Sequence, residues 1–323
     1  MLKEGSNIEE SIIFTKKQDE ESHYRQVSGL DKDGNAYAFT GEALKFWDGK
    51  AAHVIGDKYV VMGNQLDDAV LESMANVFEN SKGTLAERLL GSLLAGQKAG
   101  GQISGKQSAA LVVKGLNNDW YNQIDLRVDH SDQPFEELQV LMNYHYGRIR
   151  LNQSIFAHGF GNTKRAKNKL IEAEELLNGW NGMYGKIAYA HSLLGNDEQA
   201  VKWMKKGLSE NPNWKVNLPA FYYLSTHKEL KSLIKPETFS TKNWENAIQM
   251  LIRLKRYDEA IRTLLKINSE GMNSSYLQYL LGFSYRGKGR VDDAKRALNE
   301  ALILDKENVE AEILLDELNT KPK

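Results

Sequence analysis

The organisation of the second half of the chain is decided by residues 275–301, which read SYLQYLLGFSYRGKGRVDDAKRALNEA. The periodic apolar residues, interrupted at Gly289, predict two helices joined by a short break. Antiparallel helices can approach closely only where small side chains face each other, so we expect Gly282 to lie against Ala294. The large residues around this contact then fill the gap to a neighbouring unit. A stack of units therefore buries apolar surface that one unit alone would leave exposed.

The same arrangement recurs along the chain. Ala200, Ala260 and Ala294 each lie one turn into a predicted helix that follows a break, and the last two are 34 residues apart. This spacing is the period of the tetratricopeptide repeat, which the stretch resembles at Leu281, Gly282, Tyr285, Gly289, Ala294, Leu298 and Ala301. From Ala200 to Ala260 there are 60 residues, which predicts an irregular insert at 213–241. Residues 164–323 are therefore predicted to form an all-α, tetratricopeptide-like repeat domain that ends in a capping helix over 309–318.

The first half, residues 1–150, has a mixed pattern. An amphipathic helix near residue 8 precedes a hairpin of 24–30 and 36–40, because an Asp/Gly/Asn turn separates two short runs typical of strands. Further strands are expected at 54–55, 59–62, 109–113 and 124–128, and helices at 66–80, 84–98 and from Pro134 to about residue 150. Strands grouped apart from helices indicate an α+β domain.

Composition excludes several kinds of chemistry. The chain has 323 residues, a net charge of −1 and no Cys, which excludes disulfides, thiolate zinc sites and cysteine nucleophiles. Its seven His residues show neither H-x-x-x-H spacing nor an accompanying carboxylate cluster, so we expect no metal and no cofactor. No apolar run approaches bilayer length, and the balanced charge gives no reason to expect nucleic acid. Residues 1–150 carry 16 Lys and Arg against 22 Asp and Glu, whereas the remainder carries 26 against 21.

Two local features invite a functional interpretation. Residues 100–107, GGQISGKQ, nearly match the phosphate-binding loop, but Gln107 replaces the Mg²⁺-binding hydroxyl. The loop is also predicted to follow a helix and precede a strand, the reverse of what phosphate binding needs, so a flexible glycine loop is favoured. Trp203 and Trp214 could line a peptide groove, although core packing or closure of the insert is the more ordinary use of such residues.

The first half also resembles a bacterial family known as domain of unknown function 1028. The matching stretches are 24–27 (YRQV), 39–41 (FTG), 63–64 (GN), 85–90 (LAERLL), 105–110 (GKQSAA) and 125–129 (DLRVD). The resemblance covers residues 1 to about 145 and implies an αββα sandwich related to the N-terminal-nucleophile hydrolases. It therefore implies a hydrolase of amide bonds, and some family members continue into similar repeats.

One departure from the family bears on mechanism. In such hydrolases a terminal Thr, Ser or Cys uses its own α-amine as general base, and the segment that carries it is missing from this sequence. Met1 is not a nucleophile, and Ser6 lies in the wrong part of the pattern. We expect that Met1 is an internal methionine of a longer protein and that the sandwich is incomplete, so the chain as printed should be inactive. The alternative is a genuine short protein that uses the domain as a platform.

Six polar residues flank the predicted strands and could outline a pocket. They are Arg25, Gln26, Asn64, Gln107, Ser108 and Arg127. Side chains in such positions suit substrate anchoring or oxyanion donation. The alternative is that Arg25 and Arg127 pair with carboxylates and that Asn64 shapes a turn.

Two hypotheses about function follow. In the first, the complete protein is an amide-bond hydrolase that carries a repeat module. In the second, it is a non-enzymatic scaffold whose repeats offer a concave, mildly basic surface to a peptide or protein partner. Unpaired strand edges in an incomplete first domain would make it poorly soluble or a homodimer. The cytoplasm is the default compartment.

Overall fold

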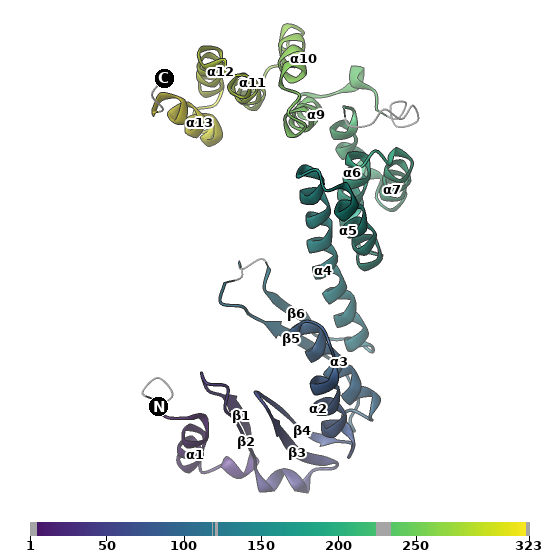
Figure 1. The fold of residues 1–323 in the computed structure, drawn as a ribbon, viewed down its shortest axis with the longest axis vertical. Helices are drawn as coiled ribbons and strands as arrows, with labels where there is room; N and C mark the ends of the chain where they lie inside the picture. The colour runs from purple at the N-terminus through teal and green to yellow at the C-terminus, as the bar shows by residue number, and fades with distance from the viewer. Residues whose placement is uncertain (1–4, 118, 120–121, 224–233, 321–323) are drawn as a thin grey trace. The chain divides into compact units, whose positions relative to one another are not determined.

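The computed structural model describes residues 5–117, 119, 122–223 and 234–320 (Figure 1). The chain divides into two compact units, residues 1–145 and 146–323. The first unit combines small sheets with helices and the second is a helical repeat region, which confirms the predicted fold class.

In the described part of the first unit, the strands pair as three antiparallel hairpins. They are β1 (Gln26–Leu30) with β2 (Ala36–Thr40), β3 (Lys50–Gly56) with β4 (Tyr59–Leu66), and β5 (Ala109–Val113) with β6 (Ile124–Val128). The predicted first turn is stabilised by Asp31, whose carboxylate accepts hydrogen bonds from the backbone N–H groups of Asp33 and Asn35. Gly34 takes the positive φ that this turn requires.

Helices cover these hairpins. They are α1 (Ile8–Gln18), α2 (Val70–Asn80) and α3 (Leu85–Lys98). Helix α1 packs on the first hairpin so closely that a Cβ atom at Gly29 would overlap the Ile8 side chain. Helices α2 and α3 pack together, and α2 buries Leu71 and Phe78 in a cluster with Tyr59. Helix α2 begins later than the predicted 66–80, because β4 continues to Leu66.

Helix α4 (Pro134–Gly159) runs past the predicted end near residue 150. No proline interrupts it, and its later turns gain tertiary contacts. Leu151 is fully buried, and the Ser154 hydroxyl donates to the carbonyl of Ala166. The helix ends at Gly159, just before Gly161 adopts a positive φ.

The second unit is built from consecutive helices. They are α5 (Thr163–Leu176), α6 (Tyr184–Leu193), α7 (Asp197–Glu210), α9 (Thr241–Arg253), α10 (Tyr257–Ser269), α11 (Ser275–Gly287), α12 (Val291–Leu304) and α13 (Val309–Thr320). Ala200, Ala260 and Ala294 are each the fourth residue of a helix and are fully buried. A Cβ atom at Gly282 would lie 2.7 Å from Leu298 Cγ and 3.2 Å from the carbonyl oxygen of Ala294. The predicted close approach is therefore confirmed.

The described part of the irregular insert contains two 3₁₀ segments, η6 (Pro212–Phe221) and η7 (Pro236–Thr238). The predicted range 213–241 also includes 224–233, which lie outside the described residues. Leu218 and Phe221 of η6 are buried in a core cluster with Ala188, Met204 and Ala247. This packing holds the segment against the repeat helices. Of the helices in the described ranges, none has the length and apolar character needed to cross a membrane.

Candidate functional site

Gln26 joins the first two hairpins of the first unit. Its Nε2 atom donates to the carbonyl oxygens of Gly63 at 2.9 Å and Ala52 at 3.2 Å. Its Oε1 accepts from Asn64 Nδ2 at 3.0 Å. Two of the six candidate residues, Gln26 and Asn64, are thus in direct contact.

A hydroxyl–imidazole pair adjoins this contact. Thr40 faces Gln26 across the first hairpin, and its Oγ1 lies 3.2 Å from Gln26 Nε2 and 2.9 Å from His53 Nδ1. Sequence reasoning did not single out Thr40 or His53. The hairpin register places Thr40 opposite Gln26, but nothing in the sequence indicated that His53 would reach it.

Arg25 and Arg127 lie in exposed ion pairs with nearby carboxylates. Arg25 Nε is 3.1 Å from Asp19 Oδ2, and Arg127 donates to Asp129 Oδ1 at 2.6 Å. The hydrogen bond and charge of Asp129 raise the pKa of the Arg127 guanidinium. Both arginines therefore have the carboxylate partners that the alternative interpretation expected.

Gln107 and Ser108 line a separate cavity of about 540 Å³ between α2, α3 and the glycine loop, whose floor includes Met74, Leu93 and Phe135. Gln26 and Asn64 are not among its lining residues. Gln107 Nε2 lies 3.0 Å from His130 Nδ1. The six candidates thus occupy at least two places rather than one pocket. The glycine loop follows α3 and precedes β5, as predicted.

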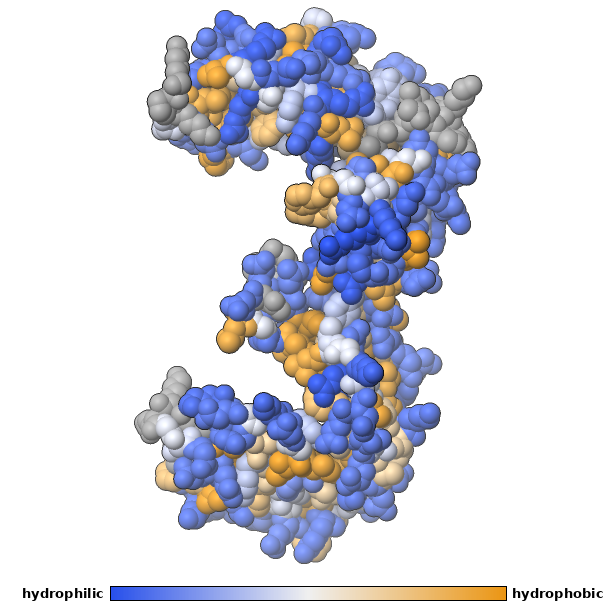
Figure 2. Space-filling view, in the orientation of Figure 1, coloured by the Kyte–Doolittle hydropathy of each residue, from blue (hydrophilic) through white to orange (hydrophobic). Residues whose placement is uncertain are grey.

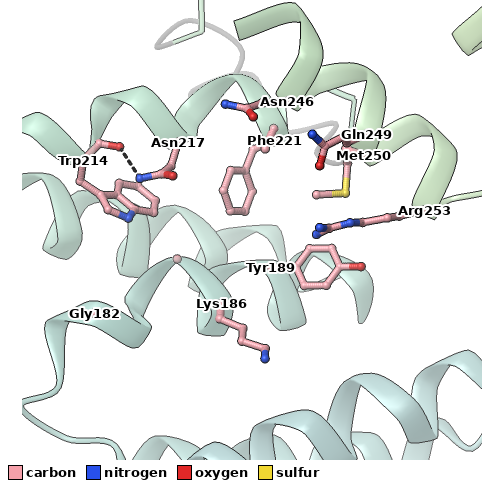
Figure 3. Close-up of a pocket in the computed structure, with 12 residues that line it drawn as sticks. Gly182, Lys186, Tyr189, Trp214, Asn217, Phe221, Asn246, Gln249, Met250 and Arg253 are labelled. Carbon is pink, nitrogen blue, oxygen red and sulfur yellow. Dashed lines mark hydrogen bonds between the residues drawn. The ribbon is translucent and has the colours of Figure 1, made fainter. Parts of the chain in front are cut away.

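The second unit contains a larger pocket of about 640 Å³, walled by α6, η6 and α9 (Figure 3). Each segment contributes side chains at helical spacing. Gly182, Lys186 and Tyr189 come from α6 and the turn before it, Trp214, Asn217 and Phe221 from η6, and Asn246, Gln249, Met250 and Arg253 from α9. Residues three, four and seven apart share one side of an α-helix, so α9 directs one face into the pocket. We call this the repeat pocket.

Trp214 forms one wall of the repeat pocket because two glycines leave room for its indole. A Cβ atom at Gly185 would lie 2.7 Å from Trp214 Cζ2, and one at Gly207 would lie 3.4 Å from Cδ2. The other tryptophan considered from sequence, Trp203, instead donates to the partly buried carboxylate of Glu174 at 2.6 Å and packs against Tyr184. Of the two tryptophans, Trp214 lines the repeat pocket and Trp203 packs in the core.

The repeat pocket is positively charged. Lys186 Nζ donates to the neutral amide of Asn152 at 2.6 Å. Loss of hydration, followed by the positive charges of Arg148 and Arg253, lowers the pKa of the Lys186 ammonium. Sequence reasoning expected a mildly basic repeat surface but did not identify Lys186 or Arg253.

Within the described ranges, no group of three or more His, Asp or Glu side chains is arranged to hold a metal ion.

Hydrophobic side chains also reach the surface of the first unit, where they appear as orange and pale atoms among blue ones in Figure 2. The exposed members include Val27, Leu30, Phe46, Trp47, Ile55, Ile103, Val112 and Leu116. Several lie on or beside the three hairpins.

The class defined by these observations is an α+β domain followed by a helical repeat array. Residues 1–138 match the model described as "Family of unknown function (DUF1028)", and residues 182–213 match the tetratricopeptide repeat model. The resemblance drawn from the sequence is confirmed.

Solved structures with similarity to this chain include a DUF1028 protein and a tetratricopeptide protein. A DUF1028 protein from Silicibacter pomeroyi is 32% identical with a TM-score of 0.38, over 43% of this chain and 60% of that one. This chain therefore spans about 60% of that relative. MamA from Desulfovibrio magneticus RS-1 is 19% identical (TM-score 0.25), over 54% of this chain and 83% of that one. A tetratricopeptide protein from Thermus thermophilus is 13% identical (TM-score 0.28), over 54% of this chain and all of that one. No curated protein matches the chain.

Proposed function

We propose that this protein is an interaction protein whose repeat pocket binds a peptide segment of a partner. The observation that carries the proposal is the convergence of α6, η6 and α9 on one cavity of about 640 Å³ with both aromatic and amide side chains. That volume lies within the range typical of ligand sites. The amide side chains of Asn246 and Gln249 can bond a peptide backbone, and the nearby apolar side chains can contact its side chains.

A phage-displayed peptide library selected on the whole chain tests the proposal. We expect enriched peptides to bind the wild-type chain and to lose most of their affinity for Gln249→Ala and Trp214→Ala. Gln249→Ala changes a partly exposed side chain and should leave folding intact, so it guards against a loss that comes only from unfolding. Tyr24→Ala, an exposed substitution in the first unit, is the matched control. Enriched peptides that bind all three variants equally would show that the repeat pocket is not the binding site.

A second proposal concerns the first unit, for which the family resemblance implies amide-bond hydrolysis. The contact that favours hydrolysis is the hydrogen bond between the Thr40 hydroxyl and His53, since a nucleophile is activated by such a base. A working base is usually oriented by a third group, and among the described residues the His53 ring has Thr40 as its one hydrogen-bond partner. We therefore propose that the first unit is a hydrolase-like scaffold that does not turn over amides in this chain.

Turnover of a panel of amide substrates checks the proposal that the first unit does not hydrolyse amides. We expect no release of amine above the uncatalysed rate. Turnover that disappears in Asn64→Ala and in Thr40→Val, while both variants keep the wild-type circular dichroism spectrum, would overturn it and make the first unit an enzyme.

A further inference from the structure

A cavity in the first unit has no part in the peptide-binding function. It is the cavity of about 540 Å³ between α2, α3 and the glycine loop, which we call the loop cavity. Its apolar lining comes from four elements and comprises Met62, Leu66, Val70, Met74, Leu93 and Phe135. The volume lies within the range of small-molecule sites, and such sites combine apolar walls with a few polar groups that fix the orientation of a ligand.

The glycine loop beside this cavity is anchored at both ends. The backbone N–H of Ile103 donates to the carbonyl oxygen of Gln65 at 2.8 Å, which ties the start of the loop to β4. At the other end, the backbone N–H of Ser131 donates to the carbonyl oxygen of Gln107 at 2.9 Å. These bonds hold the rim of the loop cavity in place before a ligand binds, which lowers the ordering cost of binding.

Four polar side chains on the rim are available to a ligand. They are those of Gln97, Gln102, Ser104 and Ser108. None of them has a hydrogen-bond partner in the part of the chain that the structure describes. Lys106 is the one charged residue in the described lining, and its Nζ lies 3.4 Å from Glu136 Oε1, so the rim suits a neutral ligand. A carboxamide both donates and accepts, so its best complement carries an N–H and a C=O side by side.

A methionine sulfur lies close to one of these carboxamides. A Cβ atom at Gly101 would lie 2.8 Å from Gln97 Oε1, and one at Gly96 would lie 2.8 Å from Met74 Sδ. Because Gly96 directly precedes Gln97, the sulfur and the carboxamide adjoin the same turn of α3. Methionine sulfur makes favourable contacts with aromatic rings, and the Phe135 ring favours an aromatic neighbour for the same reason. The lining therefore favours a flat aromatic ring over a saturated one.

We infer that the loop cavity binds a neutral aromatic lactam, a flat ring whose N–H and C=O groups stand side by side. The two groups bond the carboxamides of Gln97 and Gln102, and the ring lies among Met62, Met74 and Phe135. This site is separate from the repeat pocket. It gives the first unit a binding role that requires no turnover.

Binding of three defined probes to the whole chain tests the inference. 2-Quinolone is a neutral aromatic lactam, quinoline has the same fused rings without the N–H and C=O, and δ-valerolactam has both groups on a saturated ring. Saturation-transfer difference NMR, titrated with each probe, gives the three dissociation constants. We expect 2-quinolone to bind at least about tenfold more tightly than either of the others, because it alone uses both the amides and the apolar lining.

Single substitutions that keep the wild-type circular dichroism spectrum locate the ligand. Gln97→Ala and Gln102→Ala should each weaken 2-quinolone about two- to tenfold and leave quinoline nearly unchanged, since each removes one hydrogen bond. Met74→Leu keeps the side-chain volume but removes the sulfur, and it should weaken both aromatic probes about two- to tenfold. Gln18→Ala replaces an exposed glutamine of α1 outside the lining, and this matched control should change nothing.

Several results would overturn the inference. Quinoline that binds as tightly as 2-quinolone would show that the amides do not recognise the ligand, and δ-valerolactam that does so would show that the aromatic ring is not recognised. No binding of 2-quinolone to the wild-type chain, or equal losses in Gln97→Ala and Gln18→Ala, would show that the loop cavity is not the site. Peptide binding is tested with separate variants in the repeat pocket, so the peptide-binding function stands or falls independently of these results.

Discussion

Replacing Gly185 with Ala should displace the Trp214 indole, which forms one wall of the repeat pocket. The added methyl group would lie 2.7 Å from Trp214 Cζ2, closer than non-bonded carbon atoms approach, so the indole or helix α6 must move. Overpacking of this kind costs about 1–3 kcal/mol, and exchanging Gly for Ala in a helix returns up to about 1 kcal/mol. The expected net change is a loss of about 0–3 kcal/mol in the free energy of unfolding, together with weaker peptide binding.

Gly207→Ala is the matched control, because it places the same group against the same indole from another helix. There the distance to Trp214 Cδ2 is 3.4 Å, an ordinary van der Waals contact. The higher helix propensity of Ala should therefore dominate and stabilise the protein by up to about 1 kcal/mol. Urea unfolding followed by tryptophan fluorescence measures both variants. Equal stability and identical fluorescence spectra for the two would refute the argument that Gly185 sets the position of Trp214.

Four further predictions concern the two cores and the surface. Ala294→Leu should lower the free energy of unfolding by about 1–3 kcal/mol in urea titrations, because the site opposite Gly282 is already filled; an unchanged midpoint would contradict this. Gln26→Ala removes the donor that joins two hairpins and should cost about 1–3 kcal/mol by the same measurement, whereas Gln133→Ala, on the surface, should cost little. Burial and then the hydrogen bond to Glu79 raise the pKa of Tyr59 from 10.0 to about 12. The stability that the neutral phenol provides is therefore present below pH 10 and lost as the pH rises towards 12, so Tyr59→Phe should show a smaller loss over that interval, and parallel curves would disprove it. Finally, the exposed apolar residues of the first unit should make the protein dimerise, and sedimentation velocity that shows a monomer without bound hydrophobic dye would contradict this.

Local chemistry explains which parts of the fold could be predicted. The hairpin around Asp31 depends on a turn whose hydrogen bonds lie within five residues, and the repeat units depend on small residues at a fixed spacing. The end of α4 was predicted too early, because its last turns are held by contacts of Leu151 and Ser154 that sequence periodicity does not contain.

The candidate sites show the same division between local and distant contacts. Gln26 and Asn64 were both singled out, but their contact spans 38 residues and was not foreseen. The repeat pocket is harder to predict from the sequence, because Lys186, Trp214 and Arg253 come from three separate segments and no local pattern links them. Of these, sequence reasoning considered Trp214 alone as a groove residue.

The 3₁₀ segment η6 both packs on the repeat helices and lines the repeat pocket. Leu218 and Pro219 are buried, Leu218 in a core cluster with repeat residues, whereas Trp214 and Asn217 line the repeat pocket. Exchanging Asn217, an exposed side chain, would alter what the protein accepts while Leu218 and Trp214 stay packed on the repeat helices. The insert is therefore a natural place to diversify when the array is to be engineered toward new targets.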